Sequence, residues 1–131
     1  MKFTRLTPNL VVRDVRAAVQ FYQSVLGLQL GITVPDAPPY VFASVTNGAG
    51  VEIFFNDQKA VGEDYPDLAR DPLGGTVTVF LECEGIEEVL KAVQMSGARI
   101  VMALKTQFYG IREFAFEDPE GWIITMAERV T

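Results

Sequence analysis

Histidine is absent from the 131-residue sequence. Its absence removes the commonest metal ligand and the side chain that most often acts as a general base near neutral pH. Zinc sites of the Cys/His type and Ser-His-Asp or Cys-His catalytic arrangements are therefore excluded. The single cysteine, Cys83, excludes an internal disulfide and agrees with a reducing compartment. We expect Cys83 to be a small buried apolar side chain within a strand.

Long apolar runs and a basic surface are missing as well. No stretch approaches the roughly 20 apolar residues that a membrane-spanning helix needs, and residues 1–5 lack the apolar core of a signal peptide. Lys and Arg number 11 against 17 Asp and Glu, which gives a formal net charge of −6. A phosphate backbone would be repelled by this charge. We expect a cytoplasmic protein with no nucleic-acid and no membrane partner.

One order of elements occurs twice along the chain. An apolar run at residues 6–12 precedes an amphipathic stretch that opens at Asp14 and closes at Gly27, and a run at residues 77–83 precedes a similar stretch closing at Gly97. The two closing glycines lie 70 residues apart (97 − 27). Three further strand-like runs follow each stretch. This offset predicts an α+β fold of two tandem β-α-β-β-β modules, with equivalent positions around one shared cleft.

The duplication also sets the expected boundaries. We predict a single domain over residues 1–131, with module one at about 1–56, a linker at about 57–75 and module two at about 76–131. Residues 34–39 carry three prolines, which remove donors from a strand ladder and predict an exposed loop. The 20-residue segment 56–75 also reads as a loop, and both loops are expected to be mobile.

Strand periodicity predicts which side chains pack beneath the helices. Leu6, Leu10 and Val12 are expected to pack inward in the first strand, and Val77, Val79, Leu81 and Cys83 in the equivalent strand of module two. The alternate positions then line the shared cleft with Thr, Asn, Glu and Phe. Such a mixture of aromatic surface and a few polar groups suits a small organic ligand.

Several local motifs carry a resemblance to a known family. They include the pairs Phe21-Tyr22 and Leu26-Gly27 of the first helix, residues 51–54 and 109–114, and the turn at residues 118–121 with the sequence Asp-Pro-Glu-Gly. Together they resemble the vicinal-oxygen-chelate superfamily and, within it, the glyoxalase / bleomycin-resistance / extradiol-dioxygenase family. The resemblance implies paired curled sheets that form a cup, and a homodimer as the native unit.

The resemblance also implies where metal-dependent members hold their ligands. One ligand, usually His, lies on the first strand of each module and one, usually Glu, on the last. In this sequence those positions match Thr7 and Glu52 in module one and Thr78 and Thr125 in module two. A neutral hydroxyl is a poor ligand for zinc, nickel or iron. We therefore expect no metal and no other cofactor.

The expected function is metal-free binding of a small organic ligand in the cup, which resembles the drug-sequestering resistance proteins of the family. A cationic ligand would suit Glu52, which keeps a charge and shares its face with an aromatic ring. Arg112 and Glu113 are adjacent, so only one of them faces the cup. The residues expected to bind ligand are Thr7, Asn9, Glu52, Phe54, Thr78, Phe80, Arg112 and Thr125.

Two other functions remain open at this stage. In the first, the protein is an enzyme of the glyoxalase-like lyase or isomerase type, and Glu52 is the catalytic residue. Glu52 would then act as a general base without the usual metal, its pKa raised by desolvation in a partly apolar cup. In the second, the protein is a degenerate subunit with a structural or regulatory role. Turnover distinguishes the enzyme from the binding protein.

Overall fold

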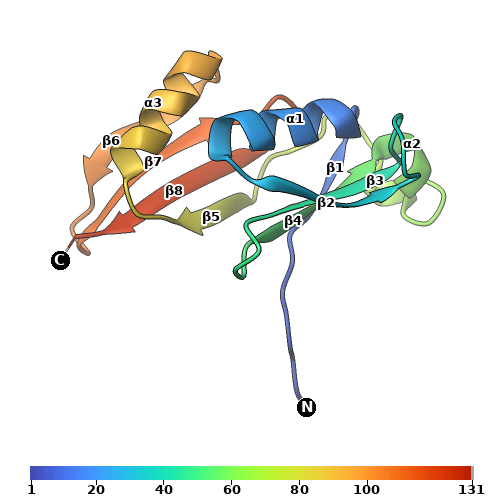
Figure 1. Ribbon diagram of the computed structural model, residues 1–131, viewed down its shortest axis with the longest axis horizontal. Helices are drawn as coiled ribbons and strands as arrows, with labels where there is room; N and C mark the ends of the chain where they lie inside the picture. Colours follow the sequence, from blue (N-terminus) through green and yellow to red (C-terminus); the bar gives the residue numbers. More distant parts are fainter. Residues whose placement is uncertain (131) are drawn as a thin grey trace. The chain divides into compact units, whose positions relative to one another are not determined.

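The computed structural model describes residues 1–130, which form two compact units, Met1–Asp71 and a second that begins at Pro72. The first unit contains, in chain order, β1 (Asn9–Val12), α1 (Val15–Leu26), β2 (Gln29–Val34), β3 (Phe42–Thr46), β4 (Glu52–Asp57), α2 (Gln58–Val61) and the 3₁₀ turn η1 (Pro66–Leu68) (Figure 1). The second contains β5 (Thr78–Glu82), α3 (Ile86–Ser96), β6 (Ile100–Thr106), β7 (Ile111–Glu117) and β8 (Ile123–Arg129). No helix in residues 1–130 is long and apolar enough to cross a membrane.

The two units repeat one topology. Each holds a four-stranded mixed sheet, in the order β1-β4-β3-β2 in the first and β5-β8-β7-β6 in the second. The first strand of each set pairs in parallel with the last, and the remaining pairs are antiparallel. The predicted α+β fold with two β-α-β-β-β modules is confirmed.

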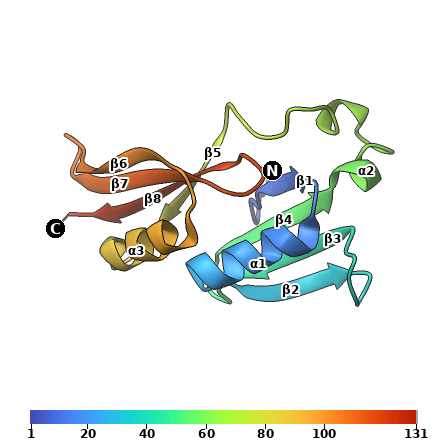
Figure 2. The same cartoon turned by 90° about the horizontal axis from the view of Figure 1, so that it is seen from above.

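Helix α1 forms because its sequence supplies a cap, an apolar stripe and a stop. The Asp14 carboxylate accepts the Ala17 N–H at 3.0 Å, and Gly27 closes the helix in the left-handed region at φ 69°. The stripe includes Tyr22, which is fully buried with its ring centroid 5.0 Å from that of Phe55 on β4. Figure 2 shows α1 lying across one face of its sheet, which leaves the opposite face uncovered.

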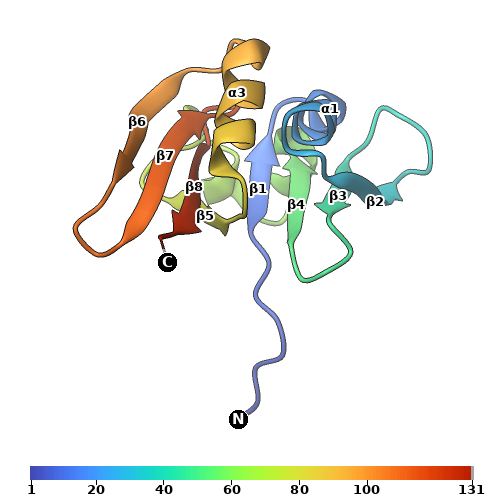
Figure 3. The ribbon, with the colours of Figure 1, turned by 60° about the vertical axis from the view of Figure 1, so that its left-hand side comes forward.

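The N-terminus of helix α3 is capped by a side chain from strand β8. Gly85 precedes it and offers no side chain, so the Glu128 carboxylate on β8 accepts the N–H groups of Gly85 at 2.7 Å and Ile86 at 3.3 Å. A carboxylate at this end of a helix also interacts favourably with the helix dipole. Ile86 and Val93 are fully buried, and Figure 3 shows α3 running along one face of the second sheet.

Three expectations at the element level are wrong. The first strand begins at Asn9, so Leu6 lies outside the ladder and is 90% exposed instead of packed under α1. Val77 precedes β5 and is 58% exposed. The segment at residues 56–75 is not a structureless loop, because β4 runs to Asp57 and two short helical turns follow. Cys83 lies just after β5 and is half-buried.

Cys83 is expected to react slowly with a thiol reagent. Burial raises the pKa of its thiol, and the Glu128 carboxylate raises it further. A raised pKa leaves less of the reactive thiolate at neutral pH. With Ellman's reagent at pH 7, the rate is therefore expected to fall below that of free cysteine and to recover as the pH rises above 9.0. A rate equal to that of free cysteine at pH 7 would contradict this placement of the thiol.

Candidate functional site

The uncovered face of the first sheet carries the polar and aromatic side chains that the sequence assigns to ligand. Asn9 pairs in register with Phe54, and the Asn56 side-chain amide donates to Asn9 Oδ1. Phe54 is half-buried and packs edge-on against Phe42, with ring centroids 5.1 Å apart. The structure therefore brings Asn9 and Phe54 together on one surface, as predicted from strand alternation.

Thr7 and Glu52 line a hollow at the start of this sheet. Its volume is about 580 Å³, and its walls come from residues 4–7 and from the β3–β4 turn. Arg5 Nη1 lies 3.2 Å from Glu52 Oε1, with the Arg5 side chain 72% exposed and that of Glu52 24% exposed. The chain thus places one of its own cations on the carboxylate that was predicted to bind a cationic ligand.

Thr78 and Thr125 contact each other directly in the second sheet. Their Oγ1 atoms are 2.6 Å apart, and Thr78 Oγ1 also donates to the Ile123 carbonyl at 3.2 Å. Phe80 pairs in register with Thr125 and is half-exposed, at 49%. Thr78, Phe80 and Thr125 therefore lie on one face of the sheet, which is the face that α3 does not cover.

These donor groups do not fit the divalent metal that the resemblance implies for other members. Two threonine hydroxyls hydrogen-bonded to each other are neutral and mutually satisfied, and they offer a metal no charge. In residues 1–130, no group of three or more His, Cys, Asp or Glu side chains is arranged to hold an ion.

Arg112 lies on the helix side of its sheet and not among the predicted ligand-binding residues. Arg112 Nη2 lies 2.8 Å from Glu87 Oε1 on α3, in an ion pair whose arginine side chain is 30% exposed. Because neighbours on a strand point to opposite faces, Glu113 occupies the uncovered face. The expectation that Arg112 joins the site is corrected, and the choice that the sequence left open falls to Glu113.

Glu113 is the buried carboxylate that the sequence did not single out. It is 6% exposed, and its Oε1 accepts hydrogen bonds from Gln107 Nε2 at 3.0 Å and from the Tyr109 hydroxyl at 2.8 Å. Within residues 1–130, Glu113 Oε2 is buried with no hydrogen-bond partner. Strand alternation pointed to this side chain as an alternative to Arg112, but nothing in the sequence showed that it would be buried.

The hydroxyl of Tyr109 is expected to lose its proton at a higher pH than an ordinary tyrosine, because its pKa is raised. Its hydrogen bond to Glu113 is the largest cause that raises its pKa above 10.0, because a tyrosinate beside a carboxylate is disfavoured. Since the folded-state pKa is raised, the stability from this contact is complete below the unfolded pKa and is lost as the pH rises through the folded value. In Glu113→Ala the absorbance titration of Tyr109 should return toward 10.0. An unchanged titration curve would show that the contact is absent in solution.

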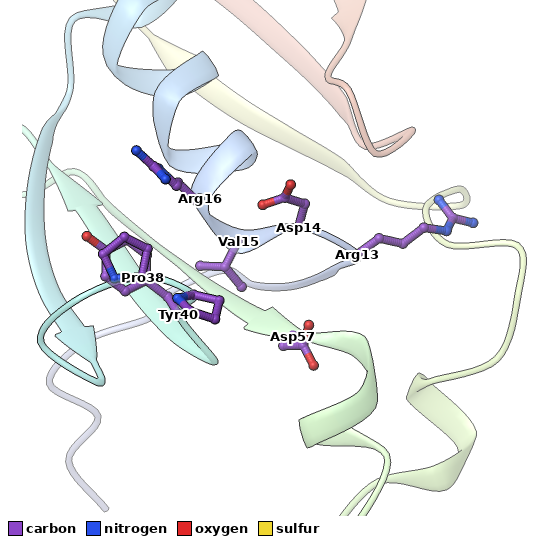
Figure 4. Close-up of a pocket in the computed structure, with 8 residues that line it drawn as sticks. Arg13, Asp14, Val15, Arg16, Pro38, Tyr40 and Asp57 are labelled. Carbon is purple, nitrogen blue, oxygen red and sulfur yellow. The ribbon is translucent and has the colours of Figure 1, made fainter.

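A third group of charged residues surrounds the start of α1. The hollow there has a volume of about 410 Å³, and Figure 4 shows Arg16, Pro38 and Tyr40 on one side and Arg13 turned away from them. Its charged groups serve the local fold. Asp14 caps α1, Asp57 accepts the Lys59 and Ala60 N–H groups at 3.1 Å, and Arg13 contacts Asp71 at 2.9 Å. It contains none of the predicted site residues.

Comparison with known proteins gives a consistent result. The model of the Glyoxalase/Bleomycin resistance protein/Dioxygenase superfamily matches residues 3–126. An uncharacterised protein of Mycobacterium bovis is 29% identical over 118 residues, which cover 88% of this chain and 77% of that protein. A glyoxalase/bleomycin resistance protein/dioxygenase from Nocardioides superposes with a TM-score of 0.78 at 25% identity, covering 99% of this chain and 85% of that one. TioX from Micromonospora sp. ML1 gives a TM-score of 0.77 at 22% identity, covering 98% and 100%, and shows the same fold.

Proposed function

Since the chain belongs to the Glyoxalase/Bleomycin resistance protein/Dioxygenase superfamily, we propose that it binds a small organic ligand bearing a cationic group, and that it does so without a metal ion. The observation that carries the proposal is the direct hydrogen bond between Thr78 and Thr125. Where metal-dependent relatives are expected to hold ligands, this chain has neutral hydroxyls that satisfy each other. What remains on the uncovered faces is aromatic surface with a few polar groups, which is typical of sites for small molecules.

Glu52 is the proposed centre of cation binding in the first unit. It lines the hollow at residues 4–7 together with Thr7, and Arg5 is the one cation within residues 1–130 that pairs with it. An exposed ion pair of this kind is worth about 0–1 kcal/mol, so a ligand can displace Arg5 at small cost. Phe54, two residues along the same strand, adds an aromatic surface on the same face, and a cation over such a ring gains further energy.

Opposite effects are expected from the two partners of this ion pair. Glu52→Gln keeps the shape and removes the charge, so it should weaken a cationic ligand by roughly 1–3 kcal/mol, the scale of a hydrogen bond to a charged group. Arg5→Ala removes the competing cation, so it should strengthen binding by up to about 1 kcal/mol. Calorimetric titration with benzamidinium, compared with its neutral isostere benzamide, measures both effects.

Folding stability provides the control for both variants. Neither side chain belongs to the core, so chemical denaturation midpoints should stay close to that of the wild type. If both variants bound benzamidinium as the wild type does, Glu52 would not be the binding group. If neither the wild type nor the variants preferred the cation to benzamide, the proposed ligand class would be wrong.

We further propose that the native unit is a homodimer. Strand β2 is an edge strand of the first sheet, and within residues 1–130 no strand pairs with its outer side. It exposes three apolar side chains, Leu30 (40%), Ile32 (65%) and Val34 (49%). Exposed apolar edge strands favour association with a second chain. Light scattering at micromolar concentration should give twice the chain mass of 14.5 kDa. A mass of one chain would contradict the proposal.

A further inference from the structure

The second sheet contains a carboxylate whose surroundings leave one oxygen unmatched. Glu113 Oε1 accepts two hydrogen bonds, from Gln107 and Tyr109, while Oε2 is buried and accepts none from residues 1–130. A buried acceptor without a donor costs free energy, and more so when it carries charge. The folded chain therefore leaves Oε2 of Glu113 without the hydrogen-bond donor that a buried carboxylate oxygen requires.

The strand register shows which side chains surround Glu113. Glu82, Ala127, Glu113 and Lys105 form one row across β5, β8, β7 and β6. The next row contains Phe80, Thr125 and Ala115. Both rows lie on the face that α3 leaves uncovered, and small side chains occupy its centre.

The charged neighbours of Glu113 do not donate a hydrogen bond to its Oε2 atom. Lys105 is paired with it in register, yet it is exposed and forms no ion pair in the described part of the chain. Glu82 is already paired with Arg129 Nη2 at 3.2 Å. Within residues 1–130, no cation therefore contacts the Glu113 carboxylate, and a donor that carries a positive charge matches it best.

Aromatic surface stands beside the carboxylate. The Tyr109 hydroxyl donates to Glu113 Oε1, and half of the Tyr109 residue is exposed. The ring of Phe108 packs edge-on against the Tyr109 ring, with the ring centroids 5.1 Å apart. Phe80 is exposed to a similar extent on β5. A carboxylate flanked by exposed rings is suited to a small molecule with a cationic end and an aromatic body.

We propose that Glu113 is a second ligand-binding carboxylate, which takes the ammonium or amidinium end of a small aromatic ligand on the uncovered face of the second sheet. The proposal rests on the proposed function only in assuming that the uncovered faces take small organic ligands. It is independent of Glu52, which belongs to the other unit. Gln107 and Tyr109 act as positioning residues that hold Oε1, and they leave the buried Oε2 without a donor from residues 1–130.

Residue-resolved NMR titration with benzamidinium and with benzamide tests the proposal. In the wild type, the amides of residues 107–113 and of Ala127 should shift saturably with the cation, and the cation should bind about ten to a hundred times more tightly there than benzamide. Glu113→Gln, which keeps an acceptor for Gln107 and Tyr109, should abolish that preference. Glu117→Gln is the matched control, since it lies on the same strand and face but is paired with Arg99 at 2.9 Å.

Each outcome decides between a binding role and a purely structural one. If Glu113→Gln kept the preference for benzamidinium, Glu113 would only hold the β6–β7 turn and the proposal would fail. If Glu117→Gln lost it equally, the effect would be general surface charge, which also overturns the proposal. Glu52→Gln separates the two sites, because it should leave the shifts at residues 107–113 unchanged. The wild-type shifts require no variant, so a variant that does not fold leaves the test intact.

Discussion

Replacing Phe55 by alanine is expected to destabilise the protein by about 3–5 kcal/mol, the scale of large-to-small substitutions of buried aromatic side chains. Phe55 is fully buried in β4 beneath α1, with its ring centroid 5.0 Å from that of Tyr22. Truncation removes an aromatic contact between the helix and the sheet and leaves a cavity that the packed core cannot fill. Urea denaturation followed by circular dichroism measures the loss.

Phe54 provides the matched control because it is the neighbouring residue on the same strand. It points to the uncovered face and is only half-buried, against Phe42. Phe54→Ala should therefore cost about 1–2 kcal/mol of stability, in proportion to the smaller area that it buries. Phe54→Ala should also weaken benzamidinium binding. Phe55→Ala protein that remains folded should bind benzamidinium as the wild type does. Equal losses of stability in the two variants would contradict the assignment of the two faces.

Gly74→Ala is expected to destabilise the second unit by at least about 2 kcal/mol, from a strained backbone and a steric overlap together. Gly74 has φ +85°, and an added Cβ would lie 2.5 Å from the carbonyl oxygen of Gly121 and 2.8 Å from its carbonyl carbon. Both are backbone atoms of the Asp-Pro-Glu-Gly turn before β8, so they cannot move aside as a side chain does.

The adjacent glycine separates the two causes. Gly75 has φ +99°, but an added Cβ would meet nothing within 4 Å. Gly75→Ala should therefore show only the conformational cost, about 1 kcal/mol. Thermal unfolding of the two variants, compared with the wild type, measures the difference. A Gly75→Ala variant as unstable as Gly74→Ala would show that the contact with Gly121 contributes nothing.

The duplicated modules were predictable because local signals repeat along the chain. Asp14 as a cap, Gly27 and Gly97 as left-handed stops, and the glycine turns between strands are each specified by a few neighbouring residues. The ends of the first strand of each module were not predicted correctly. An apolar residue such as Leu6 favours a strand in the sequence whether or not a partner strand extends far enough to pair with it.

The groups that make up the candidate site depended on contacts between distant segments. Strand alternation placed Asn9 and Phe54 on one face of the first sheet and Thr78 and Thr125 on one face of the second, because alternate side chains of a strand point to the same face. The Arg5 contact with Glu52, the Glu128 cap on α3 and the burial of Glu113 join residues far apart in the sequence or depend on packing. No local pattern encodes them, which is why Arg112 was chosen in place of Glu113.

Binding of small organic cations without a metal is tested most directly by an NMR titration of protein dialysed against EDTA. Benzamidinium is the ligand, and benzamide is its neutral counterpart. We expect saturable shifts on the uncovered sheet faces, a preference for the cation, and the same dissociation constant before and after dialysis. Binding that disappears after dialysis and returns with added zinc, or no preference for the cation in either sample, would contradict it.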